Sequence, residues 1–217
     1  MRSQREVVSC RIGERDMEAL DFIARFGFVS RMSLMKRWGE ERRQLIERLG
    51  WLDSKGLVAI SDGDWDGNAL HSCTVAGLRV CGRSALAPPP RARAEPLAIV
   101  AEMAAIEERL GGRVVSGREL AATEAGGLCE SAASERLLHP DLVILGAGSA
   151  PLAVEVEVAP RGAKQLEELM RTWAAAVAEG RFAAVSWRCS HAALSGAEAA
   201  ADLAGASPSV LVRGLWR

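Results

Sequence analysis

The feature that most constrains the fold is a proline-rich stretch near the middle of the 217-residue chain, SALAPPPRARAEP at residues 84–96. Three consecutive prolines lack the backbone N–H groups that a helix interior or a central strand requires, so neither element can run through this stretch. Such a composition is typical of a stiff linker. We therefore expect two small domains, at residues 1–84 and 97–217, joined by a linker at residues 85–96.

The overall charge does not indicate a nucleic-acid partner, because 27 basic residues are balanced by 28 acidic ones. Hydrophobic residues make up 49% of the chain and charged residues 25%, which is typical of an ordinary globular protein. Residues 25–55 are different, since they hold eight basic and four acidic side chains. This local surplus of positive charge could serve contacts with phosphate groups.

The cysteines and the N-terminal sequence indicate where the protein is located. Five scattered cysteines without a C-x-x-C pair argue against a structural zinc site and favour reduced thiols. The N-terminus, MRSQREVVSCRIGERD, is charged and lacks an apolar signal core. No later apolar run is long enough to span a bilayer. We expect a soluble, cytoplasmic protein without a membrane partner.

The part before the linker is expected to contain three short helices followed by a hairpin. Apolar periodicity indicates helices at residues 16–26, at 31–38 and from about residue 40, and strands at 57–60 and 68–75. A glycine follows each helix, as is common at helix C-termini. This order predicts a winged helix-turn-helix, in which the third helix enters the major groove of DNA and the hairpin lies beside it.

The polar face of the second and third helices carries the candidate contacts with double-stranded DNA. The alternative is that these charges only form the solvated face of structural helices. The aspartates of the hairpin loop, Asp62, Asp64 and Asp66, count against a close approach of the wing to phosphate. The candidate DNA-contacting residues are Lys36, Arg37, Arg42, Arg43, Gln44 and Arg48.

The part after the linker predicts a mixed α/β domain. A helix is expected from Pro96, and a long loop at residues 121–138. The chain is expected to end in a helix and an edge strand, at 195–203 and 209–215. Between these elements the pattern predicts strands at 113–116, 142–145 and 152–158, a helix at 163–179, and a strand at 182–187.

Three carboxylates of this domain are candidates for a cation site. Glu155 and Glu157 alternate with valines, so both leave the same face of one strand, roughly 6.6 Å apart along it. Asp141 opens a neighbouring strand. Carboxylates that converge on Mg²⁺ or Mn²⁺ can activate a water molecule for phosphodiester hydrolysis, and Lys164 could assist from the next helix. The alternative is the solvated polar face of a strand.

Two resemblances follow from these residues. The order helix, three strands, helix, strand, with Pro140-Asp141 before the acid-x-acid strand, is similar to the PD-(D/E)XK nuclease superfamily. Most of residues 16–187 resembles the replication-relaxation family, whose members carry a winged helix and then segments of the type HPDLVIL and AVEVEVAPR. In this chain, these segments begin at His139 and Ala153.

Membership implies a winged helix-turn-helix followed by a restriction-endonuclease-like αβββαβ domain, an α+β or α/β fold. It also implies DNA binding in plasmid or mobile-element replication, transfer or transcriptional regulation. Asp141 and Glu155 would map to the two metal ligands, whereas Glu157 stands where a lysine is usual. We therefore expect weak or absent catalysis, with the domain acting as a dimerisation or accessory module.

Two alternatives remain open. The protein could be a magnesium-dependent endonuclease that uses Asp141, Glu155 and Glu157 as metal ligands and catalytic residues, assisted by Lys164. It could also be an interaction module whose winged helix binds another protein rather than DNA.

Overall fold

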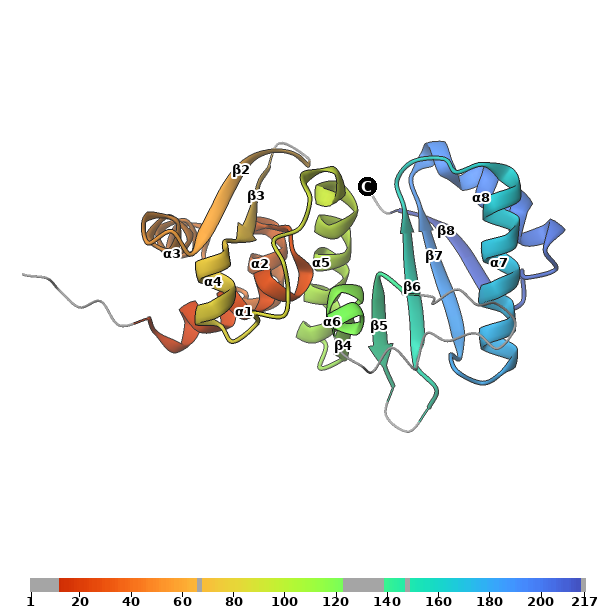
Figure 1. Ribbon diagram of the computed structural model, residues 1–217, viewed down its shortest axis with the longest axis horizontal. Helices are drawn as coiled ribbons and strands as arrows, with labels where there is room; N and C mark the ends of the chain where they lie inside the picture. Colours follow the sequence, from red (N-terminus) through yellow and green to blue (C-terminus); the bar gives the residue numbers. More distant parts are fainter. Residues whose placement is uncertain (1–11, 66–67, 123–138, 147–148, 216–217) are drawn as a thin grey trace, which may run out of the picture.

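The computed structural model describes residues 12–65, 68–122, 139–146 and 149–215. The chain forms a mixed α and β structure with two sheets, so the expected fold class is confirmed at this level. Figure 1 shows the two sheets at opposite ends of an elongated molecule, with helix α5 between them. Among the described residues, no helix combines the length and the apolar character needed to cross a bilayer.

The first sheet has three antiparallel strands in the order β1-β3-β2. Helices α1, α2 and α3 precede its hairpin, as predicted. Buried Leu45, Leu49 and Leu52 form the inner face of α3, which also matches the predicted apolar stripe. The elements are α1 (Glu14–Phe26), β1 (Val29–Ser30), α2 (Arg31–Trp38), α3 (Arg42–Ser54), β2 (Val58–Trp65), β3 (Asn68–Cys73) and α4 (Val75–Val80).

Local capping explains why α2 has the predicted bounds. The Ser30 side chain accepts a hydrogen bond from the backbone N–H of Ser33, which satisfies one of the free donors at the helix start. Gly39 ends the helix in the left-handed region, at φ 67°, a conformation in which a side chain would be strained. The sequence alone was enough to predict both ends.

The second sheet has five strands in the order β4-β5-β6-β7-β8. Strands β4, β5 and β6 pair antiparallel, and β7 and β8 continue in parallel after helical crossovers. The elements are the 3₁₀ turn η1 (Arg91–Arg93), α5 (Ala94–Arg109), β4 (Arg113–Ser116), α6 (Gly117–Ala122), β5 (Leu142–Leu145), β6 (Leu152–Glu157), α7 (Ala163–Ala178), β7 (Ala184–Cys189), α8 (His191–Leu203) and β8 (Val210–Gly214).

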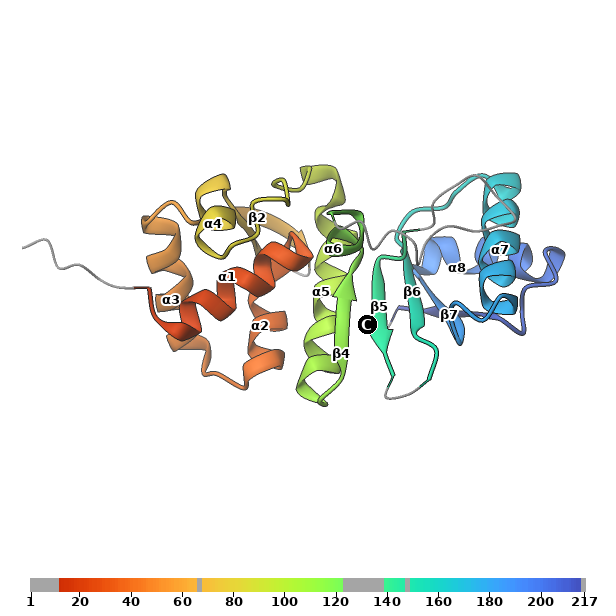
Figure 2. The same ribbon diagram turned by 60° about the horizontal axis from the view of Figure 1, so that its bottom comes forward.

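Helix α5 packs against both halves of the molecule (Figure 2). Its buried residues include Ile99, Val100 and Met103, which belong to one hydrophobic cluster with side chains of α1 and α3 on one side and with Val154 and Val156 of β6 on the other. Helices α7 and α8 cover the opposite face of the five-stranded sheet. The helix after the linker therefore lies inside one core that continues from the first unit to one face of the five-stranded sheet, and the predicted domain division remains a prediction.

Ion pairs add to this junction. The Arg25 guanidinium of α1 is 11% exposed and lies 2.7 Å from a Glu108 carboxylate oxygen of α5 and 3.0 Å from a Glu119 oxygen of α6. It also donates a 2.7 Å hydrogen bond to the backbone carbonyl of Val114. Arg37 of α2 pairs with the same Glu108. These charges fix the relative position of the elements before and after the linker.

The structure differs from the predicted elements in several places. Helix α5 begins at Ala94, inside the predicted linker, because Pro96 fits the first turn, where its missing N–H costs nothing. Residues 117–122 form α6, so the predicted loop begins with helix, and the rest of it, 123–138, lies outside the described residues. Strand β2 extends to Trp65, through the predicted hairpin loop. Of the loop aspartates, Asp66 lies outside the described residues.

The buried position of Arg25 leads to a stability prediction. Arg25→Ala removes the cation that Glu108 and Glu119 share and leaves them only Arg37 and Arg83 respectively, so we expect a loss of about 3 kcal/mol in the free energy of unfolding, the lower end of the range for a broken buried ion pair. The measurement is urea unfolding followed by circular dichroism. Arg43→Ala is the matched control, since the Arg43 side chain is 88% exposed. Equal stability of the two variants would contradict the prediction.

Candidate functional site

The pairing of β5 and β6 brings the three candidate acids together. Leu142 pairs with Val154 in the antiparallel register, so the preceding residue, Asp141, lies beside the middle of β6. The Asp141 Oδ2 atom accepts a 2.9 Å hydrogen bond from the backbone N–H of Val156. Asp141 is thereby anchored next to the residue that separates Glu155 from Glu157.

The alternation of β6 decides which side the glutamates face. Val154 and Val156 pack into the cluster shared with α5, whereas Ala153 packs into the cluster formed with α7 and α8. Glu155 and Glu157 share the face of Ala153. They are 8% and 4% exposed, so their interpretation as a solvated strand face is wrong.

Burial and mutual repulsion disfavour negative charge at this site. Burial raises the pKa of Glu155 well above its usual range, and the nearby Asp141 carboxylate raises it further, while Arg161 opposes both effects through its charge. Burial also raises the pKa of Asp141, against the stabilising hydrogen bond from the Val156 N–H and the charge of Arg93.

Two arginines supply compensating positive charge to these acids. The Arg93 guanidinium lies 3.1 Å from the Asp141 Oδ1 atom, and the Arg161 Nε lies 2.7 Å from Glu157 Oε2. Arg161 also opposes the burial that raises the pKa of Glu157. Lys164 is exposed in the first turn of α7. Its predicted role as the assisting cation remains a prediction, whereas Arg161 occupies the position beside the acid.

The carboxylate groups of Asp141, Glu155 and Glu157 are of the type that binds a hard cation, but their present positions do not form a metal site. Carboxylate oxygens are the ligands that Mg²⁺ and Mn²⁺ prefer. Within the described parts of the chain, however, no three acidic, histidine or cysteine side chains converge as a ready-made metal site. Asp141 and Glu157 face their arginine partners, so these two ion pairs would have to open before both side chains could bind a cation.

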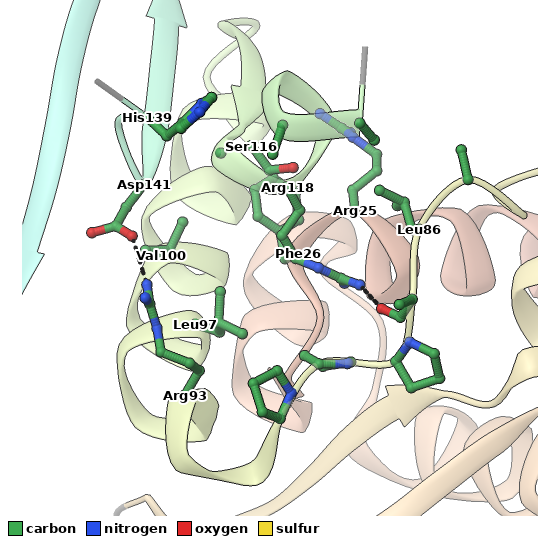
Figure 3. Close-up of a pocket in the computed structure, with 18 of the residues that line it drawn as sticks. Arg25, Phe26, Leu86, Arg93, Leu97, Val100, Ser116, Arg118, His139 and Asp141 are labelled. Atoms are coloured by element: carbon green, nitrogen blue, oxygen red, sulfur yellow. Dashed lines mark hydrogen bonds and ion pairs between the residues drawn. The ribbon is translucent and has the colours of Figure 1, made fainter. Parts of the chain in front are cut away.

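A cavity of about 520 Å³ opens beside Asp141 (Figure 3). One end is polar and holds His139, Asp141 and Arg93, while Phe26 and Leu97 contribute to its apolar wall. The proline run of residues 88–90 closes one side. Sequence reasoning missed this cavity and the role of Arg93, because Arg93 lies in the predicted linker, 48 residues before its partner.

The six predicted DNA-contacting residues divide into two groups. Lys36, Arg37 and Arg48 form ion pairs within the fold, with Glu102, Glu108 and Asp16 respectively. Arg48 is therefore not directed to water as predicted, since its side chain is 22% exposed. The remaining three lie exposed in the first turn of α3: Arg42, Arg43 and Gln44.

No protein-family model matches this chain, and no curated protein or solved structure matches it either. The resemblance to the replication-relaxation family therefore remains a prediction.

The raised pKa of Glu155 predicts a pH dependence of stability. The folded chain keeps a proton on Glu155 at pH values where the unfolded chain has released it, so the free energy of unfolding falls as the pH rises above the usual range of a glutamate. Each unit of pKa difference corresponds to about 1.4 kcal/mol. We expect Glu155→Gln to reduce this fall and to be more stable than the wild type at pH 7.5.

Urea unfolding at pH 4.5 and 7.5 measures this effect. Glu47→Gln is the control, because the Glu47 side chain is 64% exposed on α3 and should leave the pH dependence unchanged. An equal pH dependence for Glu155→Gln and the wild type would show that the unfavourable charge lies elsewhere.

Proposed function

We propose that the protein binds double-stranded DNA through the N-terminal turn of α3, as a winged helix-turn-helix protein. The observation that carries this proposal is the exposed set Arg42, Arg43 and Gln44 on the third helix of a three-helix unit, followed by the β2-β3 hairpin. In winged helix-turn-helix proteins, the corresponding helix enters the major groove and the hairpin lies beside it.

The electrostatics of this turn suit a phosphate or base-edge contact. The N-terminus of a helix carries partial positive charge and free backbone N–H groups, which adds to the charges of Arg42 and Arg43. The partner of Arg43 is Glu47, in an exposed pair on the same helix. Exposed pairs of this kind contribute little stability, so a DNA phosphate can replace the glutamate at low cost.

The five-stranded unit supports a PD-(D/E)XK-like domain as the second part of this protein. It follows the order α5, β4, α6, β5, β6, α7, β7, with Asp141 directly before β5 and Glu155 on the adjacent strand β6. Glu157 stands in place of the usual lysine, and arginines pair with two of the acids. These features favour an accessory role with weak or absent catalysis, in the replication, transfer or regulation of a plasmid or mobile element.

The DNA-binding proposal is tested by charge reversal in α3. We expect the double variant Arg42→Glu/Arg43→Glu to abolish a salt-sensitive gel shift with duplex DNA, because it replaces two phosphate contacts with repulsion. The matched control is Arg171→Glu, which reverses an exposed arginine on α7, in the other half of the molecule. Unchanged DNA binding by the double variant would contradict the proposal. If the wild type binds no DNA at low salt, the result would favour a protein as the partner.

A second candidate function, a magnesium-dependent endonuclease, is favoured by one observation. Asp141, Glu155 and Glu157 lie together, with Glu155 and Glu157 buried, and burial raises the pKa of all three although Arg93 and Arg161 oppose the shift, so the site would gain from further positive charge. A divalent cation would supply that charge and could activate water for attack on a phosphodiester.

Metal binding and cleavage can be measured separately. We expect Mn²⁺ to raise the melting temperature of the wild type. In Arg93→Ala, Asp141 has lost its arginine partner, so a lower Mn²⁺ concentration should give the same increase. In Glu155→Ala, Mn²⁺ should leave the melting temperature unchanged. Nicking of a supercoiled plasmid with Mg²⁺ or Mn²⁺ tests catalysis. Nicking that survives in Glu155→Ala, or a thermal shift that this variant keeps, would rule out the acids as the metal site.

A further inference from the structure

The cavity beside Asp141 has the size and the lining of a small-molecule site (Figure 3). Its volume of about 520 Å³ lies within the range of about 300–1,000 Å³ that is typical of such sites. Phe26, Leu86 and Leu97 contribute apolar walls, and residues 88–90 add three prolines. These walls suit a ligand with an apolar body.

Three arginines line the cavity, and their charges are matched to different degrees. Arg25 pairs with two carboxylates, and Arg93 pairs with the carboxylate of Asp141. Arg118 of α6 differs from both, because its hydrogen bonds go to backbone carbonyls and no carboxylate of the described chain lies within ion-pair distance of it. Of the three cations, Arg118 is therefore the one whose charge a ligand can match.

The Arg118 guanidinium is held in place by neutral groups on both sides of the cavity. Its Nη1 group donates a 2.6 Å hydrogen bond to the carbonyl of Ala24 in α1, and its Nη2 group donates to the carbonyl of Ala87 (Figure 3). A guanidinium has five N–H donors, so these two contacts leave donors for a ligand. Burial lowers the pKa of Arg118, and the charge of Glu119 opposes this shift. An anion beside this half-buried cation would offset the cost of its burial.

We propose that the cavity binds a small molecule with one carboxylate on a compact apolar body, and that Arg118 holds the carboxylate. A guanidinium binds a planar carboxylate through two parallel N–H···O bonds. One negative charge suits the cavity better than two, because the Asp141 carboxylate also lines it and repels a dianion such as a phosphate monoester more strongly. The apolar body lies against Phe26 and Leu97.

A ligand in this cavity would contact elements that come before and after the linker. Phe26 ends α1, Leu97 belongs to α5, and Arg118 belongs to α6. A ligand that binds only the folded chain raises the melting temperature, so binding can be followed without knowledge of the protein's activity. The inference is independent of DNA binding by α3.

The test uses the full chain, with cinnamate as the probe and cinnamamide as its neutral counterpart. The two molecules share one apolar body and differ in charge. Isothermal titration calorimetry at low salt measures both affinities, and thermal unfolding measures both shifts in melting temperature. We expect the wild type to bind the carboxylate about tenfold more tightly than the amide, because hydrogen bonds to an ionised group are roughly twice as strong as neutral ones.

Three variants locate the site. Arg118→Gln removes the charge and keeps an N–H donor group, so it should lose the preference for the carboxylate and bind the amide as the wild type does. Ala121→Phe enlarges an exposed lining residue of α6 and should weaken the binding of both probes. Arg171→Gln is the matched control, since Arg171 is exposed on α7, and it should leave both affinities unchanged.

Several results would overturn the proposal. They are a wild type that binds neither probe, equal affinities of the wild type for both, a carboxylate preference that survives in Arg118→Gln, and full affinity in Ala121→Phe. Circular dichroism checks that the variants fold. If Arg118→Gln does not fold, the carboxylate preference of the wild type and the loss of binding in Ala121→Phe decide the question together.

Discussion

The buried guanidinium of Arg25 is the interaction on which the arrangement of the molecule depends. Removal of a charge from water costs several kcal/mol, and only close carboxylates and hydrogen bonds can offset that cost. Glu108, Glu119 and the Val114 carbonyl meet this requirement, and all three lie beyond the linker. A displacement of α1 against α5 would separate the Arg25 guanidinium from both of its carboxylate partners, while Glu108 and Glu119 would keep Arg37 and Arg83. The apolar contacts on α5 would tolerate a small shift of α1 along the helix, whereas the hydrogen bonds and ion pairs of Arg25 would not. The ion pairs therefore set the relative position of the two units.

The same helix determines the charge balance at the candidate acid site. Helix α5 packs against the valines of β6, on the face opposite Glu155, and its N-terminal turn follows Arg93, the partner of Asp141. A change in the position of α5 would therefore move a cation away from a carboxylate whose burial already opposes its ionisation. Because α5 also contacts α2 through the Lys36–Glu102 pair, the unit that carries the proposed DNA-binding turn and the acid site share one rigid element.

Local sequence signals predicted the elements well, because capping and periodicity act within a few residues. The bounds of α2, β4 and β5 agree with the prediction, and Asp141 does lie beside the acid-x-acid strand. Apart from shifted element bounds and the short helix α6, the misses involve partners distant in sequence. In the sequence, Lys36 and Arg37 look like ordinary exposed residues of a helix. Only the fold shows that α5 places Glu102 and Glu108 beside them. Likewise, no periodicity distinguishes a solvated face of β6 from one buried under α7, so neither the burial of Glu155 nor its raised pKa could be predicted from the strand alone.

The arginine partners explain how this chain accommodates three neighbouring acids in a site that is largely shielded from solvent. A third acid beside Asp141 and Glu155 adds repulsion in a buried place, which must be offset for the sheet to form. Arg161, four residues after Glu157 and at the entrance to α7, supplies that charge from the chain itself. Arg93 does the same for Asp141. The acid cluster is thus compatible with folding in the absence of a cation, and a cation that binds must compete with two resident guanidinium groups. The presence of these three acids is for this reason no argument for cleavage by itself, because their charge balance has a structural explanation.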